Sequence, residues 1–176
     1  MKAMRVSTIV ALLLAMTCAA ATAHAQELKF DPTRDAARDV ELAVEKARAE
    51  GKHVLVDVGG EWCVWCHILD RFFAGDAEAR TLRDRDYVLV KVNWSPANHN
   101  DALLSRWPKI DGYPHLFVLD ASGRLVRSQS TGPLELGRGY DRDKVIAFLR
   151  RYAPRRAVTA STDYTSIAGT RASAPA

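Results

Sequence analysis

The chain has 176 residues, of which 48% are hydrophobic and 26% charged, a balance typical of a protein that folds around an apolar core. This composition excludes wholesale disorder and a collagen-like fibre. The formal net charge of +4 comes from the two ends of the chain, because positive and negative side chains balance between residues 26 and 153. A nucleic acid is therefore not the expected partner, since the excess positive charge lies outside the part that folds.

The first 25 residues have the layout of a secretory signal peptide. Lys2 and Arg5 precede an apolar run over residues 9–15, and Ala23-His24-Ala25 provides a cleavage site with small residues. The run is far shorter than the roughly 20 apolar residues that cross a bilayer. We therefore expect residues 1–25 to be removed and no membrane span to remain. The mature protein is then periplasmic or secreted, in a compartment where disulfides persist.

The spacing of apolar residues predicts the elements of one domain over residues 26–153. The expected helices are 31–50, with Asp31 as the N-cap, then 63–74, 77–83, 101–107 and a last one from Asp141 to Pro154. The expected strands are 54–58, 87–92, 115–119 and 124–128, the last two forming a hairpin. This order predicts an α/β fold in which a mixed central sheet has helices on both faces. Residues 154–176 have almost nothing to bury, so we expect a disordered tail.

Cys63 and Cys66 form a Cys-x-x-Cys motif where a predicted strand passes into a predicted helix. At a helix N-terminus the free N–H groups and the helix dipole stabilise a negative charge, so the thiolate of Cys63 is favoured. Two intervening residues place both cysteines on the first turn, close enough to form a disulfide with each other. We expect Cys63 to attack and Cys66 to release the resulting mixed disulfide.

The residues around this motif resemble the thioredoxin superfamily, and the resemblance covers about residues 53–152. Trp62 stands immediately before the first cysteine, and Tyr113-Pro114 matches the family's cis-proline. Asp57 falls where the family keeps a buried carboxylate beneath the second cysteine, and Lys91 falls where it keeps a lysine that pairs with that carboxylate. The resemblance implies a thioredoxin-like fold, from which this chain departs in that an extra N-terminal helix takes the place of the usual first strand. It also implies that Trp62, Tyr113 and Pro114 line the edge that binds a substrate peptide.

The residues themselves leave two interpretations open for Asp57, Lys91 and Trp65. An ionised carboxylate is costly to bury alone, so Asp57 is expected either to pair with Lys91 or to stay protonated. When it is paired with Lys91, the Asp57 carboxylate can take the proton of Cys66 as a general base. Alternatively, Asp57 faces solvent at a strand end and Lys91 extends to the surface. Trp65 either shields the cysteines and contacts the substrate, or packs into the core from its helix.

Two competing functions start from the same residues. Cys63-Val64-Trp65-Cys66-His67 matches Cys-x-x-Cys-His, the pattern of covalent c-type haem attachment, with His67 as an axial ligand. The second axial ligand is then not a methionine, because every methionine lies in the first 25 residues. The other alternative is a soft-metal module in which Cys63, Cys66 and His67 bind copper or zinc. No second cluster of Cys and His is visible nearby in the sequence.

The favoured hypothesis is an exported thiol–disulfide oxidoreductase that works through the dithiol of Cys63 and Cys66. The dipeptide between them, Val64-Trp65, differs from those of reducing thioredoxins and of disulfide oxidants. The resemblance favours a reductase or isomerase over an oxidase. No diffusible cofactor is expected, because electrons pass to or from a partner protein. The expected partners are client proteins with cysteines or disulfides and a redox partner protein.

Overall fold

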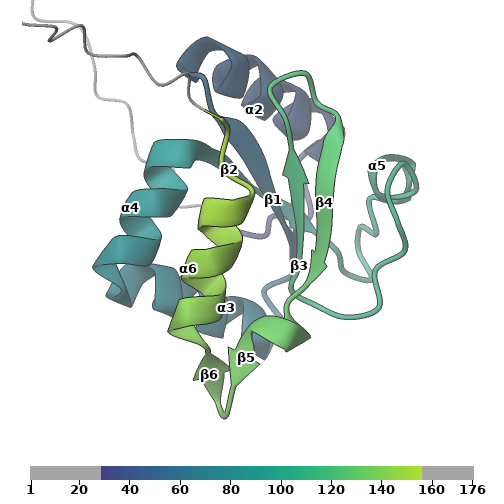
Figure 1. Ribbon diagram of the computed structural model, residues 1–176. Helices are drawn as coiled ribbons and strands as arrows, with labels where there is room; N and C mark the ends of the chain where they lie inside the picture. The colour runs from purple at the N-terminus through teal and green to yellow at the C-terminus, as the bar shows by residue number, and fades with distance from the viewer. Residues whose placement is uncertain (1–28, 156–176) are drawn as a thin grey trace, which may run out of the picture.

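The computed structural model describes residues 29–155, which form a sheet with helices on both faces (Figure 1). Four strands make the main sheet in the order β2-β1-β3-β4. They are β1 (His53–Gly59), β2 (Tyr87–Asn93), β3 (His115–Leu119) and β4 (Leu125–Ser130). The helices are α2 (Ala36–Glu50), α3 (Val64–Gly75), α4 (Ala77–Asp86), α5 (Asp101–Leu104) and α6 (Arg142–Arg151).

Strand β1 lies inside the sheet and leads directly to the cysteines. It runs parallel to β2, where Asp57 lies opposite Lys91, and antiparallel to β3, where Val58 lies opposite His115. Six of its seven residues are buried, as expected for a β-branched run that packs on both faces of a mixed sheet. The sheet is therefore mixed, as the sequence predicts, and its register places Asp57 beside Lys91.

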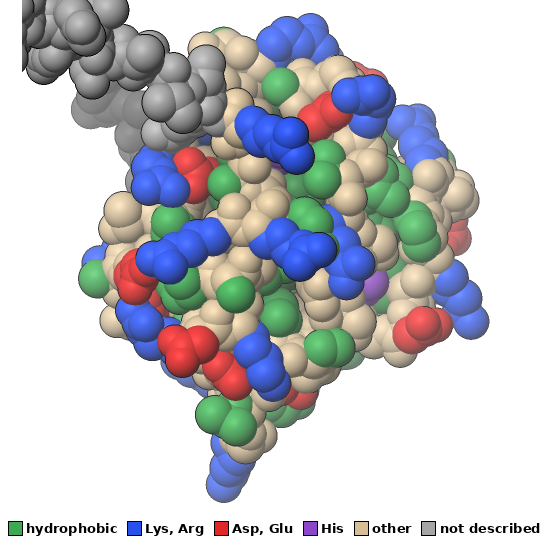
Figure 2. Space-filling view, viewed as in Figure 1, with side chains coloured by type: hydrophobic (Ala, Val, Ile, Leu, Met, Phe, Trp, Pro, Cys, Tyr) green, Lys and Arg blue, Asp and Glu red, His purple; other side chains and the backbone are tan. Residues whose placement is uncertain are grey.

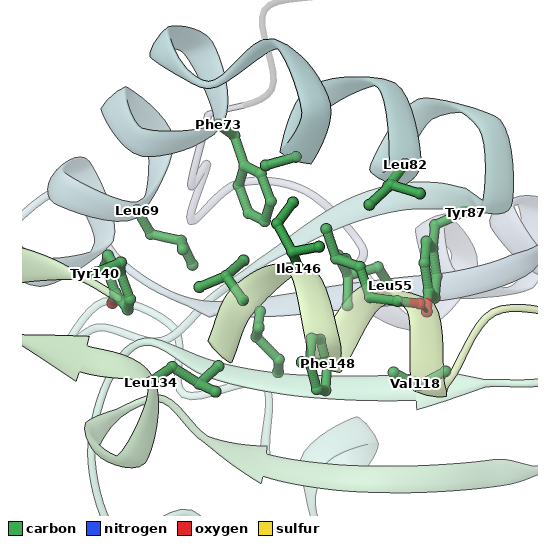
Figure 3. Close-up of a cluster of buried hydrophobic side chains, with 14 residues drawn as sticks. Leu55, Leu69, Phe73, Leu82, Tyr87, Val118, Leu134, Tyr140, Ile146 and Phe148 are labelled. Atoms are coloured by element: carbon green, nitrogen blue, oxygen red, sulfur yellow. Dashed lines mark hydrogen bonds between the residues drawn. The ribbon is translucent and has the colours of Figure 1, made fainter. Parts of the chain in front are cut away.

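Helices cover both faces of this sheet. On one face, α2 and α5 pack against alternating valines of β1, which are Val54, Val56 and Val58. On the other face, α3, α4 and α6 enclose a second apolar cluster. Figure 3 shows Leu69 and Phe73 of α3, Leu82 of α4 and Ile146 of α6 converging over the sheet. Packing in this second cluster holds α3, and with it the cysteines, against the sheet.

The first described helix begins later than predicted. Its N-cap is Asp35, whose carboxylate accepts a hydrogen bond from the backbone N–H of Arg38 at 3.0 Å. The prediction that Asp31 caps this helix is wrong. The Asp31 carboxylate instead binds the backbone N–H and the hydroxyl of Thr33, at 2.8 and 2.7 Å, so it closes a local turn.

Two small elements between β4 and α6 were not predicted. A single 3-10 turn, η1 (Gly132–Leu134), leads into a hairpin of β5 (Glu135–Leu136) and β6 (Gly139–Tyr140). Strands of two residues are too short to show a period of two in the sequence. The turn between them has Gly137 at a φ of 60°, which glycine adopts without strain.

The surface of the described part and the two ends of the chain bear on the predictions about charge, leader and tail. Among residues 29–155, no helix is both long enough and apolar enough to cross a bilayer. On the face seen in Figure 2, Lys and Arg side chains are interspersed with Asp and Glu, in keeping with the balanced charge of this region. The predicted signal peptide over residues 1–25 lies outside the described residues, as does nearly all of the predicted tail over residues 154–176.

Candidate functional site

The cysteines lie at the junction between the end of β1 and the beginning of α3. Cys63 is the N-cap of α3, and its sulfur accepts a hydrogen bond from the backbone N–H of Cys66 at 3.1 Å. No acidic side chain lies in the first turn of the helix. A thiolate at this cap faces the positive end of the helix dipole and a donated N–H group. The local structure therefore stabilises the anion of Cys63 in the reduced protein.

Cys63 and Cys66 are joined to each other in a disulfide, with their Cα atoms 5.2 Å apart. Both are buried, at 3% and 0% exposed, whereas Trp62 and Val64 on either side of Cys63 are 52% and 68% exposed. The pair therefore lies just beneath a surface that the two flanking side chains form.

Tyr113 lies beside the disulfide and is followed by Pro114, the proline that the resemblance marks as cis. The peptide bond between them is cis, and the Pro114 carbonyl accepts a hydrogen bond from the Thr131 hydroxyl at 2.9 Å. The ring of Tyr113 packs against the cysteine cluster and lies 5.6 Å from the Trp62 ring. These side chains and Cys63 therefore form one continuous patch.

Trp94 supports Trp62 and Tyr113 from the loop after β2. Its carbonyl accepts a hydrogen bond from the Trp62 indole N–H at 2.8 Å. Its ring stacks on Tyr113 with centroids 5.0 Å apart, and on His99 with centroids 4.9 Å apart. Trp62 is thus held in place although half of its surface is open to solvent.

Asp57 and Lys91 are both buried, at 3% and 7% exposed, which excludes the interpretation that they extend into solvent. The Lys91 ammonium lies 3.8 Å from Asp57 Oδ2, so the two charges are near each other, as the resemblance implies. Its short contacts are with another residue, however. Lys91 Nζ donates to both carboxylate oxygens of Asp70, each at 2.6 Å.

This arrangement leaves the Asp57 carboxylate poorly compensated. Burial raises the pKa of Asp57 to about 7; the Lys91 ammonium opposes that rise and the Asp70 carboxylate adds to it. Asp57 Oδ1 is buried and finds no hydrogen-bond donor among the described residues. A carboxyl group that titrates near neutral pH and has a free oxygen can take up and return a proton during turnover.

The role of Asp70 was not predicted, although its spacing from Cys66 in the sequence is informative. It lies four residues after Cys66, and residues four apart share one face of a helix. Asp70 therefore projects from α3 on the same side as the second cysteine. Its partner Lys91 comes from β2, and a contact between residues 21 positions apart leaves no local pattern to find.

Trp65 and His67, which flank Cys66 in the sequence, both contact other parts of the domain. Trp65 is half-buried; it packs against the cluster of Phe30, Cys63 and Cys66 and also edge-on against Tyr140, with centroids 5.8 Å apart, so it both shields the cysteines and contacts the core. The His67 ring lies 2.8 Å from the backbone carbonyl of Glu61. Within residues 29–155 no group of three or more His, Cys, Asp or Glu side chains could hold a metal ion. The sulfur atoms of Cys63 and Cys66 are bonded to each other.

Comparison with protein families and with proteins of known function gives a consistent result. A family described as thioredoxin-like matches residues 35–121, a range that includes both cysteines, Asp57 and Lys91. The thiol:disulfide interchange protein DsbD of Pseudomonas fluorescens is 30% identical over 120 residues. DsbD of Salmonella typhi is 30% identical over 84 residues. The alignments cover 67% and 48% of this chain, but only 19% and 15% of the relatives. The chain therefore spans less than a fifth of their length.

A solved structure supports the same fold. The disulphide isomerase from Xylella fastidiosa Temecula1 superposes with a TM-score of 0.61 at 23% sequence identity. The match covers 72% of this chain and 98% of that structure. At this identity the likeness concerns the architecture, a mixed sheet between helices, and it agrees with the fold that the resemblance implied.

Proposed function

Because the chain belongs to the thioredoxin-like family and is a thiol–disulfide oxidoreductase of that kind, we propose that it reduces or isomerises disulfides of exported client proteins. One observation carries the proposal: Cys63 caps α3 while its partner Cys66 is completely buried behind it. The first cysteine is thus activated and near the surface, and the second is reserved for an internal reaction. We place the protein in the periplasm or outside the cell because of its expected leader.

The first half-reaction takes place at Cys63. In the reduced protein the Cys63 thiolate attacks one sulfur of a client disulfide, and the other client sulfur leaves as a thiolate. The product is a mixed disulfide between Cys63 and the client. We assign Trp62, Tyr113 and Pro114 to the binding of the client chain, because Tyr113 packs on the cysteine cluster, Trp62 contacts Tyr113, and Pro114 follows Tyr113 through a cis peptide bond.

The second half-reaction takes place at Cys66. Its thiol passes a proton to the Asp57 carboxylate, and the resulting thiolate attacks Cys63 Sγ. The bond between Cys63 and the client breaks, the client leaves as a thiolate, and the protein retains the disulfide seen in the structure. Two electrons have passed to the client. A redox partner protein must then reduce Cys63 and Cys66, while Lys91 stabilises the Asp57 carboxylate when it loses its proton again.

A redox titration tests the direction of electron flow. The mature protein is equilibrated in glutathione buffers, and tryptophan fluorescence follows the disulfide, because Trp62 is adjacent to Cys63 in the sequence. A potential near about −270 mV supports a reductase, whereas one near about −120 mV makes the protein an oxidant and contradicts the proposal. Reduction of insulin disulfides by the pre-reduced protein provides the activity measurement.

Trapping tests the division of roles between the two cysteines. Cys63→Ser should abolish attack on a client, whereas Cys66→Ser should accumulate a covalent complex that a reducing agent releases. Turnover by Cys66→Ser at the parent rate would contradict the assignment. A Soret band in the purified protein would favour the haem alternative. Stoichiometric copper or zinc, with no disulfide exchange, would favour the metal alternative.

A further inference from the structure

Phe30 is buried although it belongs to no helix or strand. It is 1% exposed and forms a small cluster with Cys63 and Cys66. The sequence analysis assigned it no role. An aromatic ring in an irregular segment, packed directly on a reactive disulfide, is a feature that the fold alone does not require.

Gly59, the last residue of β1, lies next to both the Phe30 ring and the Cys66 sulfur. A Cβ atom placed on Gly59 would overlap the sulfur of Cys66 and would lie 3.2 and 3.3 Å from two ring carbons of Phe30. The sulfur and the ring therefore lie side by side over the same glycine. Phe30 thus borders the space that holds the sulfur of Cys66.

The same ring also contacts the buried Lys91. Lys91 Nζ lies 4.1 Å from the centroid of the Phe30 ring, within the range of a cation–π contact. This ammonium is also the group that approaches Asp57 Oδ2 at 3.8 Å. Phe30 therefore contacts Cys66, the resolving cysteine, and also Lys91, the cation that lies near the proton acceptor Asp57.

Hydrogen bonds hold the segment on either side of the ring. The backbone N–H of Phe30 donates to Glu61 Oε1 at 2.9 Å, and Glu61 belongs to the turn that leads to Cys63. Two residues further on, the Pro32 carbonyl accepts a hydrogen bond from Asn98 Nδ2 at 2.9 Å. The segment that carries Phe30 is thus tied to the active-site turn as well as to the loop after β2.

We propose that Phe30 is a positioning residue for the second half-reaction, whose ring closes the space around Cys66, Asp57 and Lys91 to bulk water, with Glu61 holding it there. This inference rests on the proposed function. With water excluded, the proton of Cys66 has Asp57 as its acceptor, and the Cys66 thiolate has Cys63 Sγ as its target. Small thiols and alkylating reagents are kept away from Cys66.

The charged and titratable groups around this space come from several elements. Lys91 on β2 favours the anion of Asp57, whereas Asp70 on α3 opposes it. Tyr140 on β6 also feels the Asp57 charge, and burial raises the pKa of its phenol. If water entered beside Phe30, it would solvate the thiolate and the carboxylate. Both groups would then lose their protons at lower pH.

Alkylation of Cys66 tests the proposal without requiring turnover. The background is the full chain with Cys63→Ser, because serine preserves the helix cap. The rate of Cys66 modification by iodoacetamide is measured against pH by peptide mass spectrometry. Phe30→Ala should raise the rate at pH 7 by about tenfold or more, and should move the midpoint of the profile to lower pH by about one unit. Phe30→Leu should restore part of the protection.

Two further variants keep the test decisive. Glu61→Ala removes the tether while leaving the ring intact, and it should raise the alkylation rate in the same direction, whereas Glu61→Gln should not. Phe148→Ala removes a ring of equal size from the cluster beneath α6, and should leave Cys66 protected. Unchanged profiles in folded Phe30→Ala and Glu61→Ala would overturn the proposal. An equal effect of Phe148→Ala would do so as well. If Phe30→Ala does not fold, the alkylation profile of Glu61→Ala alone supports or overturns the proposal.

The result also separates this inference from the proposed function. If the parent protein shows no disulfide exchange with insulin, the function fails even when Phe30 protects Cys66. If the parent exchanges disulfides but Phe30→Ala leaves the alkylation profile unchanged, only the role of Phe30 fails.

Discussion

Lys91 lies 2.6 Å from both carboxylate oxygens of Asp70, but 3.8 Å from the nearer oxygen of Asp57. The cation that compensates the buried carboxylate is therefore shared with a second one on α3. Asp70 has a side chain 39% exposed, whereas that of Asp57 is 4% exposed. Asp70 thus pairs with the buried Lys91 from a partly exposed position, and it is positioned to set how readily Asp57 holds a proton.

Asp70→Asn is expected to lower the pKa of Asp57 from about 7 toward its ordinary value. The substitution removes a negative charge that favours the protonated form, and it frees Lys91 to move closer to Asp57. Carbon-13 NMR of the Asp57 carboxyl group measures this titration. Asp70→Glu keeps the charge and serves as the control. An Asp57 titration that is the same in Asp70→Asn and in the parent would show that Asp70 has no influence.

Asp57 should also make the stability of the oxidised protein depend on pH. Its pKa is about 7 in the folded protein and about 3.9 in the unfolded chain, so between these values the folded state binds more protons. The contribution of Asp57 is therefore most favourable below about pH 4 and is lost as the pH rises toward 7. About three pKa units correspond to a loss of up to about 4 kcal/mol.

Asp57→Asn should remove this dependence and unfold at higher denaturant concentration than the parent at pH 8. Urea denaturation of both proteins at several pH values measures the difference in the free energy of unfolding. Asp84→Asn, which replaces an exposed carboxylate on α4, is the control and should behave like the parent. Equal stability of Asp57→Asn and the parent at pH 8 would mean that Asp57 is not buried as a costly charge.

Much of the scaffold could be predicted from the sequence because its signals are local. The valines of β1, the Asp141 cap of α6 and the stop at Gly75 each act through neighbouring residues. The cysteines were placed correctly for the same reason, since the N-cap of a helix is defined by residues close in sequence. The sequence favours Asp31 as the cap no less than Asp35, because both aspartates precede the helix and lie four residues apart, but only Asp35 reaches a free N–H group of the first turn.

The parts of the site that were missed depend on contacts between distant segments. Phe30 reaches the disulfide through a tether 31 residues away in the chain, and Asp70 reaches Lys91 across 21 residues. Trp94 supports Trp62 through a carbonyl, and any residue type provides a carbonyl. Such contacts are set by how α3, β2 and the loop after β2 pack together, and residue spacing does not encode them.

Gly59 is expected to tolerate no side chain, because a Cβ there would overlap the Cys66 sulfur. Gly59→Ala should lower the free energy of unfolding by about 1–3 kcal/mol, as overpacking of a filled core typically does. It should also displace Cys66 and slow disulfide exchange. Gly75→Ala is the control, since its Cβ meets no atom within 4 Å and alanine favours a helix. Denaturation and insulin reduction of both variants give the comparison, and a Gly59→Ala protein equal to the parent would contradict the close packing.

Trp62 is the exposed ring nearest to the attacking cysteine, and the last prediction concerns its part in client binding. Trp62→Ala should lower kcat/KM for a protein disulfide by about tenfold, because an aromatic anchor in an interface commonly contributes more than 1 kcal/mol. The attack of Cys63 on a small disulfide such as oxidised glutathione should change much less, since the helix cap is untouched. Leu42→Ala, which removes an exposed apolar side chain from α2, should alter neither rate. Equal losses with both substrates would instead place Trp62 in the chemistry of Cys63, whereas no loss with either would remove it from the client surface.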